Sequence, residues 1–184
     1  MLLAFSDRLN YIELTLDYGQ PPEGWDKMPL FRKDIWPLIL VCKDQILEVY
    51  LFYNAHWQGK SEANRYCSGS SFNITPLGLI SQMPPSMLNE LEWRSDFGGH
   101  LNVLYLINSN SEILAALTRL YQSPGVFCDD SYDDLGLSLV ERRHVQQLIR
   151  DIPNNNVLLG FGHDGDPVYI FGQSEILRSL NSDI

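Results

Sequence analysis

The sequence predicts an α+β fold, a mixed or antiparallel sheet of five or six strands with four or five helices. Apolar runs with a strand period and amphipathic stretches with a helix period both occur along the chain. Apolar runs separated by short polar segments occur twice, as in β-hairpins. A strand leading directly into a helix also occurs twice, at 103–120 and 168–180.

The two strand–helix units share one pattern. Four apolar residues, at 104–107 and 168–171, are followed after two or three residues by Ser-Glu-Ile-Leu at 111–114 and 174–177. A serine in this place caps a helix by accepting a hydrogen bond from a free backbone N–H, and the glutamate meets the positive end of the helix dipole. We therefore expect both serines to be N-caps and both helices to pack against the sheet.

The first part of the chain predicts strands and one short helix. Strict alternation over 11–18 is typical of a half-buried strand. The mixed stretch 25–36 predicts a short helix that ends before Pro37. The apolar runs 38–42 and 46–53, separated by three polar residues, predict a hairpin. Both faces of 46–53 are largely apolar, which indicates a central strand covered on both sides.

We expect a single domain over 1–184, within which 54–83 is a possible irregular insertion. Its first part is polar and lacks a clear period, and its last part, 72–83, is ambiguous. A helix is predicted to open at the prolines before Ser86 and to reach about Arg94.

The last part of the chain predicts an acidic loop at 127–136, followed by an amphipathic helix at 138–152. The runs 157–161 and 168–171 then predict a second hairpin with a wide turn. A final helix is expected at 174–181.

The formal net charge of the 184 residues is −10, and residues 129–184 hold ten acidic and four basic side chains, a net −6. A surface of this sign repels phosphate backbones, so we expect no direct binding of nucleic acid. It favours a cationic partner, a metal ion or simply solubility.

The three cysteines, Cys42, Cys67 and Cys128, form neither a CxxC pair nor an even set, which fits a reducing compartment. The N-terminal stretch has too few apolar residues for a signal peptide, and no apolar run approaches the ~20 residues that span a bilayer. We expect a soluble, cytoplasmic protein without membrane contact; its oligomeric state is left open.

Four carboxylates fall within six residues, at Asp129, Asp130, Asp133 and Asp134. Calcium binds such oxygen-rich loops, but the glycine and the distal glutamate of an EF-hand are missing, so we assign no metal. A solvated loop or a recognition patch for a basic partner fits better. As a patch, these carboxylates would speed association by electrostatic steering.

Tryptophans outside the predicted strands are candidate interface anchors, because tryptophan and tyrosine commonly dominate protein interfaces. Trp57 and Trp93 are assigned to the partner-binding surface, and Trp25 is a further candidate. The alternative is that they cover the edge of the core.

The turn at 160–167 interleaves three glycines with His163, Asp164 and Asp166. A histidine beside a carboxylate can act as a general base, which makes these three residues the alternative site. However, a hairpin tip needs glycine and aspartate simply to reach positive φ, and turn chemistry is our main interpretation.

A nucleophilic pair would combine Cys67 or Cys128 with a histidine, the candidates being His56, His100, His144 and His163. No flanking signature supports such a pair, and no HExxH, GxSxG or zinc-type CxxC…CxxC motif is present. We therefore assign no catalytic residue and expect no cofactor.

Together these features predict a non-enzymatic cytoplasmic protein that binds and inhibits a basic protein. In profile (small, acidic, α+β and without catalytic motifs) the chain resembles the immunity proteins that neutralise bacterial toxins. The resemblance implies a basic partner such as a toxin domain, and it carries over no site residue. The alternatives are a small hydrolase or metal-dependent enzyme using the 160–167 turn, and a structural homo-oligomeric subunit.

Overall fold

The computed structural model describes residues 8–16, 31–54, 72–96, 101–121, 125–129, 135, 137, 139–162 and 165–183. Within them, seven strands form one antiparallel sheet in the order β3-β2-β4-β6-β7-β1-β5. The strands are β1 (Asn10–Leu14), β2 (Ile46–Asn54), β3 (Phe72–Pro76), β4 (Val103–Asn108), β5 (Val126–Asp129), β6 (Asn156–Phe161) and β7 (Val168–Phe171). The α-helices are α1 (Trp36–Val41), α3 (Pro85–Asp96), α4 (Glu112–Tyr121), α5 (Leu139–Asp151) and α6 (Ser174–Asp183). Short helical turns are η2 (Phe31–Ile35), η3 (Lys43–Gln45) and η5 (Ile80–Gln82).

The α+β class and the antiparallel sheet are confirmed, and the sheet has one strand more than the upper limit that the sequence predicted. None of the helices in the described residues is long and apolar enough to cross a membrane.

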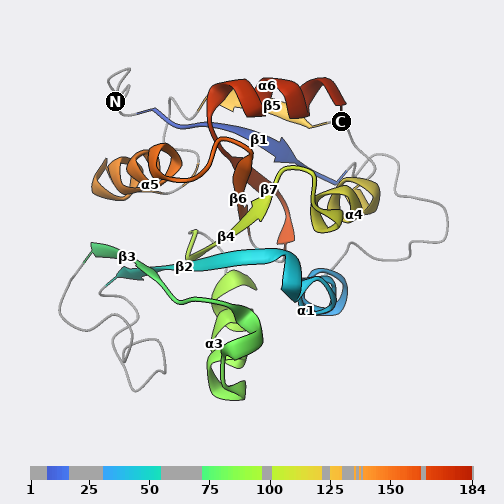
Figure 1. Ribbon diagram of the computed structural model, residues 1–184, viewed down its shortest axis with the longest axis vertical. Coiled ribbons are helices and arrows are strands. Elements are labelled where there is room, and N and C mark those ends of the chain that lie inside the picture. The colour runs from blue at the N-terminus through green and yellow to red at the C-terminus, as the bar shows by residue number, and fades with distance from the viewer. Residues whose placement is uncertain are drawn as a thin grey trace.

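The sheet is covered on both faces, because side chains along each strand alternate between two cores. On β4, Tyr105 and Ile107 face the larger core, which also takes buried side chains from α1, α3, α4 and α6. Leu104 and Leu106 face a second core, closed by Val145 of α5. Figure 1 shows α5 on one side of the central strands and α1 and α4 on the other.

Both strand–helix units are present, as β4–α4 and β7–α6, and their helices contribute to the same core. The predicted cap of the first helix is wrong. The buried Ser111 Oγ has no hydrogen-bond partner among the described residues. Instead, the N–H of Ile113 donates to Gln45 Oε1 over 3.3 Å, so a side chain distant in sequence caps α4.

The predicted hairpin of 38–42 with 46–53 is wrong, because the first of these runs belongs to helix α1. A contiguous apolar run has no strand period, and here Ile39 is 1% exposed while Val41 is 81% exposed, as on an amphipathic helix. The helix predicted within 25–36 does not stop before Pro37 either. Turn η2 continues into α1, and Pro37 stands in the first helical turn, where its missing N–H is tolerated.

Two strands that the sequence did not predict, β3 and β5, account for the higher strand count. Strand β2 lies between β3 and β4, which confirms it as a central strand. Strand β3 arises from the ambiguous stretch 72–83, and β5 takes the first residues of the stretch 127–136 that was predicted as a loop. The helices predicted at 138–152 and 174–181 and the hairpin β6–β7 are confirmed.

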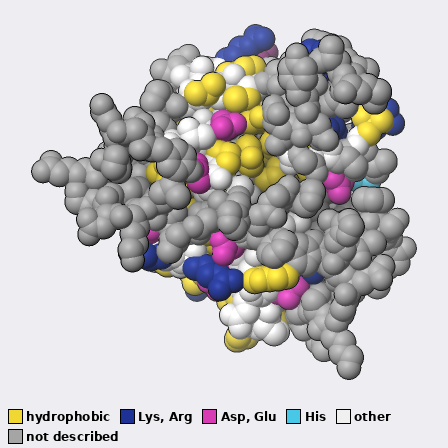
Figure 2. Space-filling view, turned by 180° about the vertical axis from the view of Figure 1, so that it is seen from behind, with side chains coloured by type: hydrophobic (Ala, Val, Ile, Leu, Met, Phe, Trp, Pro, Cys, Tyr) yellow, Lys and Arg dark blue, Asp and Glu magenta, His cyan; other side chains and the backbone are white. Residues whose placement is uncertain are grey.

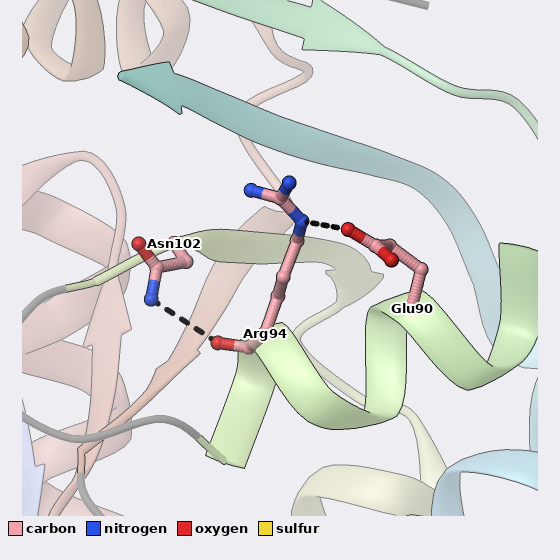
Figure 3. A network of polar contacts seen from close by, with 3 residues as sticks. All are labelled: Glu90, Arg94 and Asn102. Atoms are coloured by element: carbon pink, nitrogen blue, oxygen red, sulfur yellow. Dashed lines mark hydrogen bonds and ion pairs between the residues drawn. The ribbon is translucent and has the colours of Figure 1, made fainter. Parts of the chain in front are cut away.

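A buried polar network joins the end of α3 to the start of β4 (Figure 3). Arg94, 1% exposed, places its Nε 2.7 Å from Glu90 Oε1, one helical turn earlier. The backbone carbonyl of Arg94 accepts a hydrogen bond of 3.2 Å from Asn102 Nδ2. Close by, the hydroxyls of Ser95 and Tyr105 are 2.5 Å apart. Burial raises the pKa of Tyr105 far above its usual value, and the hydrogen bond to Ser95 opposes this in part.

Candidate functional site

Strand β5 forms one edge of the sheet. It pairs with β1, and among the described residues no strand pairs with its other side. Phe127 stands opposite Ile12 and is 38% exposed, and Val126 stands opposite Glu13 and is 57% exposed. An edge strand presents a row of unpaired N–H and C=O groups to which another chain can add. This edge combines a strand side on which no described strand pairs with exposed apolar side chains.

The acidic stretch begins at this edge. Asp129 is the last residue of β5, opposite Asn10 of β1. Asp130, Asp133 and Asp134 lie outside the described residues. On the face seen in Figure 2, acidic side chains are scattered among apolar ones, without a single dense patch among the coloured residues.

The aromatic candidates are separated from this edge. Trp93 lies on α3 and is 40% exposed, as an interface anchor needs to be. Helix α3 packs against β4 and β6, and Figure 1 shows α3 and β5 at opposite ends of the molecule. Trp93 therefore lies far from strand β5. Trp57 and Trp25 lie outside the described residues.

The turn between β6 and β7 is anchored to the body of the protein. Gly165 is buried with φ +83°, and its carbonyl accepts a hydrogen bond from the hydroxyl of Tyr121 on α4. A Cβ atom at Gly165 would overlap Cδ1 of Ile35 in η2. The N–H of Leu16, after β1, donates to Asp166 Oδ1 over 3.3 Å. The described part of the turn therefore touches three other segments.

These contacts favour turn chemistry over catalysis for the described residues. The carboxylate of Asp166 already accepts a hydrogen bond from the backbone N–H of Leu16. His163 and Asp164, the other two residues of the alternative site, lie outside the described residues.

The described cysteine and histidine candidates do not meet. Cys128 lies on edge strand β5, where its Sγ donates to the carbonyl of Val126 over 3.5 Å. His144 lies on α5 beside β2 and β3, at the other edge of the sheet. Cys67, His56, His100 and His163 are outside the described residues. Among the residues that are described, no group of three His, Cys, Asp or Glu side chains is placed to hold a metal ion.

Sequence reasoning missed a groove of about 280 Å³ between α5 and the strands β2 and β3. Tyr50 and Ile74 form its sheet side, and Leu148 and Asp151 belong to its helix side. The only sequence signal is the spacing of residues 144, 147, 148 and 151, which places them on one face of a helix. Nothing in the sequence shows that strands about 70 to 100 residues earlier face them.

Comparisons of the chain with protein-family models, with curated protein sequences and with solved structures found no match.

Proposed function

We propose that this chain is a non-enzymatic protein-binding domain that inhibits a basic protein, in the manner of an immunity protein. Its recognition surface is edge strand β5 together with the acidic residues that follow it. The observation that carries the proposal is that an exposed apolar sheet edge runs directly into four closely spaced aspartates.

The two parts of this surface supply different contributions. Val126 and Phe127 are apolar side chains that a partner can bury, and the outer side of β5, with which no described strand pairs, can accept an added strand. The carboxylates contribute mainly to the association rate and to specificity, because complementary charge steers diffusional encounter. A basic cleft of a toxin domain is a partner of this chemistry, and the aspartates would then mimic its anionic substrate.

The charge distribution supports the same proposal. Residues 129–184 carry a net charge of −6, and the preceding 128 residues carry the remaining −4. Among the described residues, Cys42 and Cys128 take part in no disulfide.

The test is affinity capture from the native cell lysate at low salt, with the bound fraction weighed by native mass spectrometry. The site variant is Asp133→Asn/Asp134→Asn. The control, Asp44→Asn/Glu112→Gln, likewise removes two negative charges. Its two residues are exposed and lie near the start of β2 and of α4, both far from β5 in the strand order. We expect wild type and control to capture a stoichiometric basic protein that added salt releases, and the site variant to capture much less of it.

Two results would contradict the proposal. Equal capture by both variants would remove the acidic stretch from the interface. Capture of a second copy of the chain in place of another protein would instead support a homo-oligomeric subunit that pairs through its sheet edge.

A further inference from the structure

We propose that the groove between α5 and the β2–β3 strands is a binding site for one arginine side chain of a partner polypeptide. The guanidinium would lie between the carboxylate of Asp151 and the ring of Tyr50, and the aliphatic stem would lie along Ile74 and Leu148. This site is separate from the β5 edge, since β3 and β5 are the opposite edges of the sheet.

The size and lining of the groove suit a single long side chain. Its volume of about 280 Å³ lies below the roughly 300–1,000 Å³ of pockets that bury a drug-sized ligand. Ile74 on β3 and Leu148 on α5 offer apolar contact, which the methylene stem of an arginine can cover. The same groove exposes polar groups along α5, where a charged head group can stay partly in water.

Three sources of negative potential lie near Tyr50, although only one of them, Asp151, lines the groove. Asp151 is the last residue of α5, so its carboxylate adds to the negative end of the helix dipole. Glu48 lies two residues before Tyr50 on the same face of β2. Burial, then Glu48 and then Asp151 raise the pKa of the Tyr50 hydroxyl, so both carboxylates act at this ring. A cation placed here is attracted by each of them and by the face of the ring.

The position of Asp151 is itself unusual. A negative charge in the last turn of a helix opposes the helix dipole, and such local violations are expected where a residue serves binding. Gln147 Nε2 donates to Asp151 Oδ1 over 3.0 Å, which orients the carboxylate. Within the described part of the chain, Asp151 Oδ2 has no hydrogen-bond partner.

Arginine fits this end better than lysine. A planar guanidinium can donate to Asp151 Oδ2 and to the amide oxygen of Gln147 while it stacks on Tyr50. A lysine ammonium offers the same charge without the planar contact. Two basic side chains are close in sequence. Arg150 is exposed and, one residue before Asp151, points to a different face of the helix, whereas His144 lines the groove about two helical turns before Asp151.

The test uses small probes, which makes it independent of any protein partner. Backbone amide NMR spectra of the whole chain are recorded during titration with Nα-acetyl-arginine amide, and with Nα-acetyl-citrulline amide as its uncharged isostere. We expect saturable shifts at Tyr50, Gln147 and Leu148 with arginine, a Kd on the order of millimolar, and at least roughly tenfold weaker binding of citrulline. The lysine analogue should bind between the two.

Two variants complete the design. Asp151→Asn keeps an acceptor for Gln147 and removes the charge, and we expect it to weaken the arginine probe by roughly tenfold. Asp44→Asn removes one exposed charge elsewhere and should leave binding unchanged. Citrulline binding as tightly as arginine, or arginine binding unaffected by Asp151→Asn, would overturn the site. The outcome of the capture experiment is independent of this test, because none of the residues changed there lines the groove.

Discussion

Gly165 provides a stringent test of how the β6–β7 turn is held. Replacing it by alanine adds a Cβ atom that overlaps Cδ1 of Ile35, a side chain that is 0% exposed. The residue also keeps φ +83°, a region that costs an L-residue roughly 1–2 kcal/mol. Overpacking of a core adds about 1–3 kcal/mol. We expect Gly165→Ala to reduce the free energy of unfolding by about 2–5 kcal/mol.

Gly78 is the matched control, because it has φ +89° but no atom within 4 Å of the position of an added Cβ. Gly78→Ala should therefore cost only the backbone part, roughly 1–2 kcal/mol. The effect of losing glycine on the unfolded chain is shared by both variants and cancels in the comparison. Urea unfolding followed by circular dichroism measures the free energy of unfolding of both variants. In a thermal unfolding experiment, each 1 kcal/mol corresponds to a shift of about 2–4 °C in Tm for a chain of this size.

A double variant identifies the colliding atom. Ile35→Val deletes Cδ1, and in the wild type we expect it to cost about 0.5–1.5 kcal/mol. In the Gly165→Ala background the same change relieves the overlap, so it should cost nothing or restore stability. Equal losses for Gly165→Ala and Gly78→Ala, together with additive effects of Ile35→Val, would refute the packing of this turn against η2.

Three further predictions concern single contacts. Asp151→Asn should raise the free energy of unfolding by about 0.3–1 kcal/mol, because it removes a negative charge from the negative end of α5; a loss of stability in chemical denaturation would contradict this. Tyr105→Phe leaves the buried Ser95 hydroxyl without its partner and should cost about 1–3 kcal/mol. The pKa of Tyr105 is higher in the folded than in the unfolded state, so the stability that this group contributes is complete below about pH 10 and is lost as the pH rises further. The phenylalanine variant lacks that loss. Stability curves of wild type and variant that run parallel above about pH 10 would contradict this pH dependence. Gln45→Ala removes the acceptor for the N–H of Ile113 and should reduce the free energy of unfolding by about 0.5–2 kcal/mol, measured by thermal unfolding. An unchanged stability would show that Gln45 does not cap α4.

The sequence predicted those elements whose own period is strong. Helices α5 and α6 bury one face each, and strand β1 alternates, so local pattern and tertiary packing agree there. Helix α1 was missed because its contiguous apolar run fits a buried strand as well as a helix, and only the packing of Ile39 into the core distinguishes them. Strand β5 was missed because its four residues are too few to show a period and lead into acidic sequence.

The candidate sites also divide into features that a local motif indicates and features that depend on contacts between distant segments. Asp166 was singled out from a local motif, and its hydrogen bond to the N–H of Leu16 depends on a residue 150 positions away. The groove at Asp151 requires α5 to face β2 and β3, a tertiary contact that no local pattern encodes. The cap of α4 by Gln45 is likewise set by how η3 meets the helix.

The most direct test of acidic recognition is the association rate of the captured partner as a function of ionic strength, for the wild type and for Asp133→Asn/Asp134→Asn. If the aspartates steer the encounter, the wild-type rate falls steeply with salt, and the variant associates more slowly and with a flatter dependence. An association rate and a salt dependence that are both unchanged in the variant would contradict recognition through the acidic stretch.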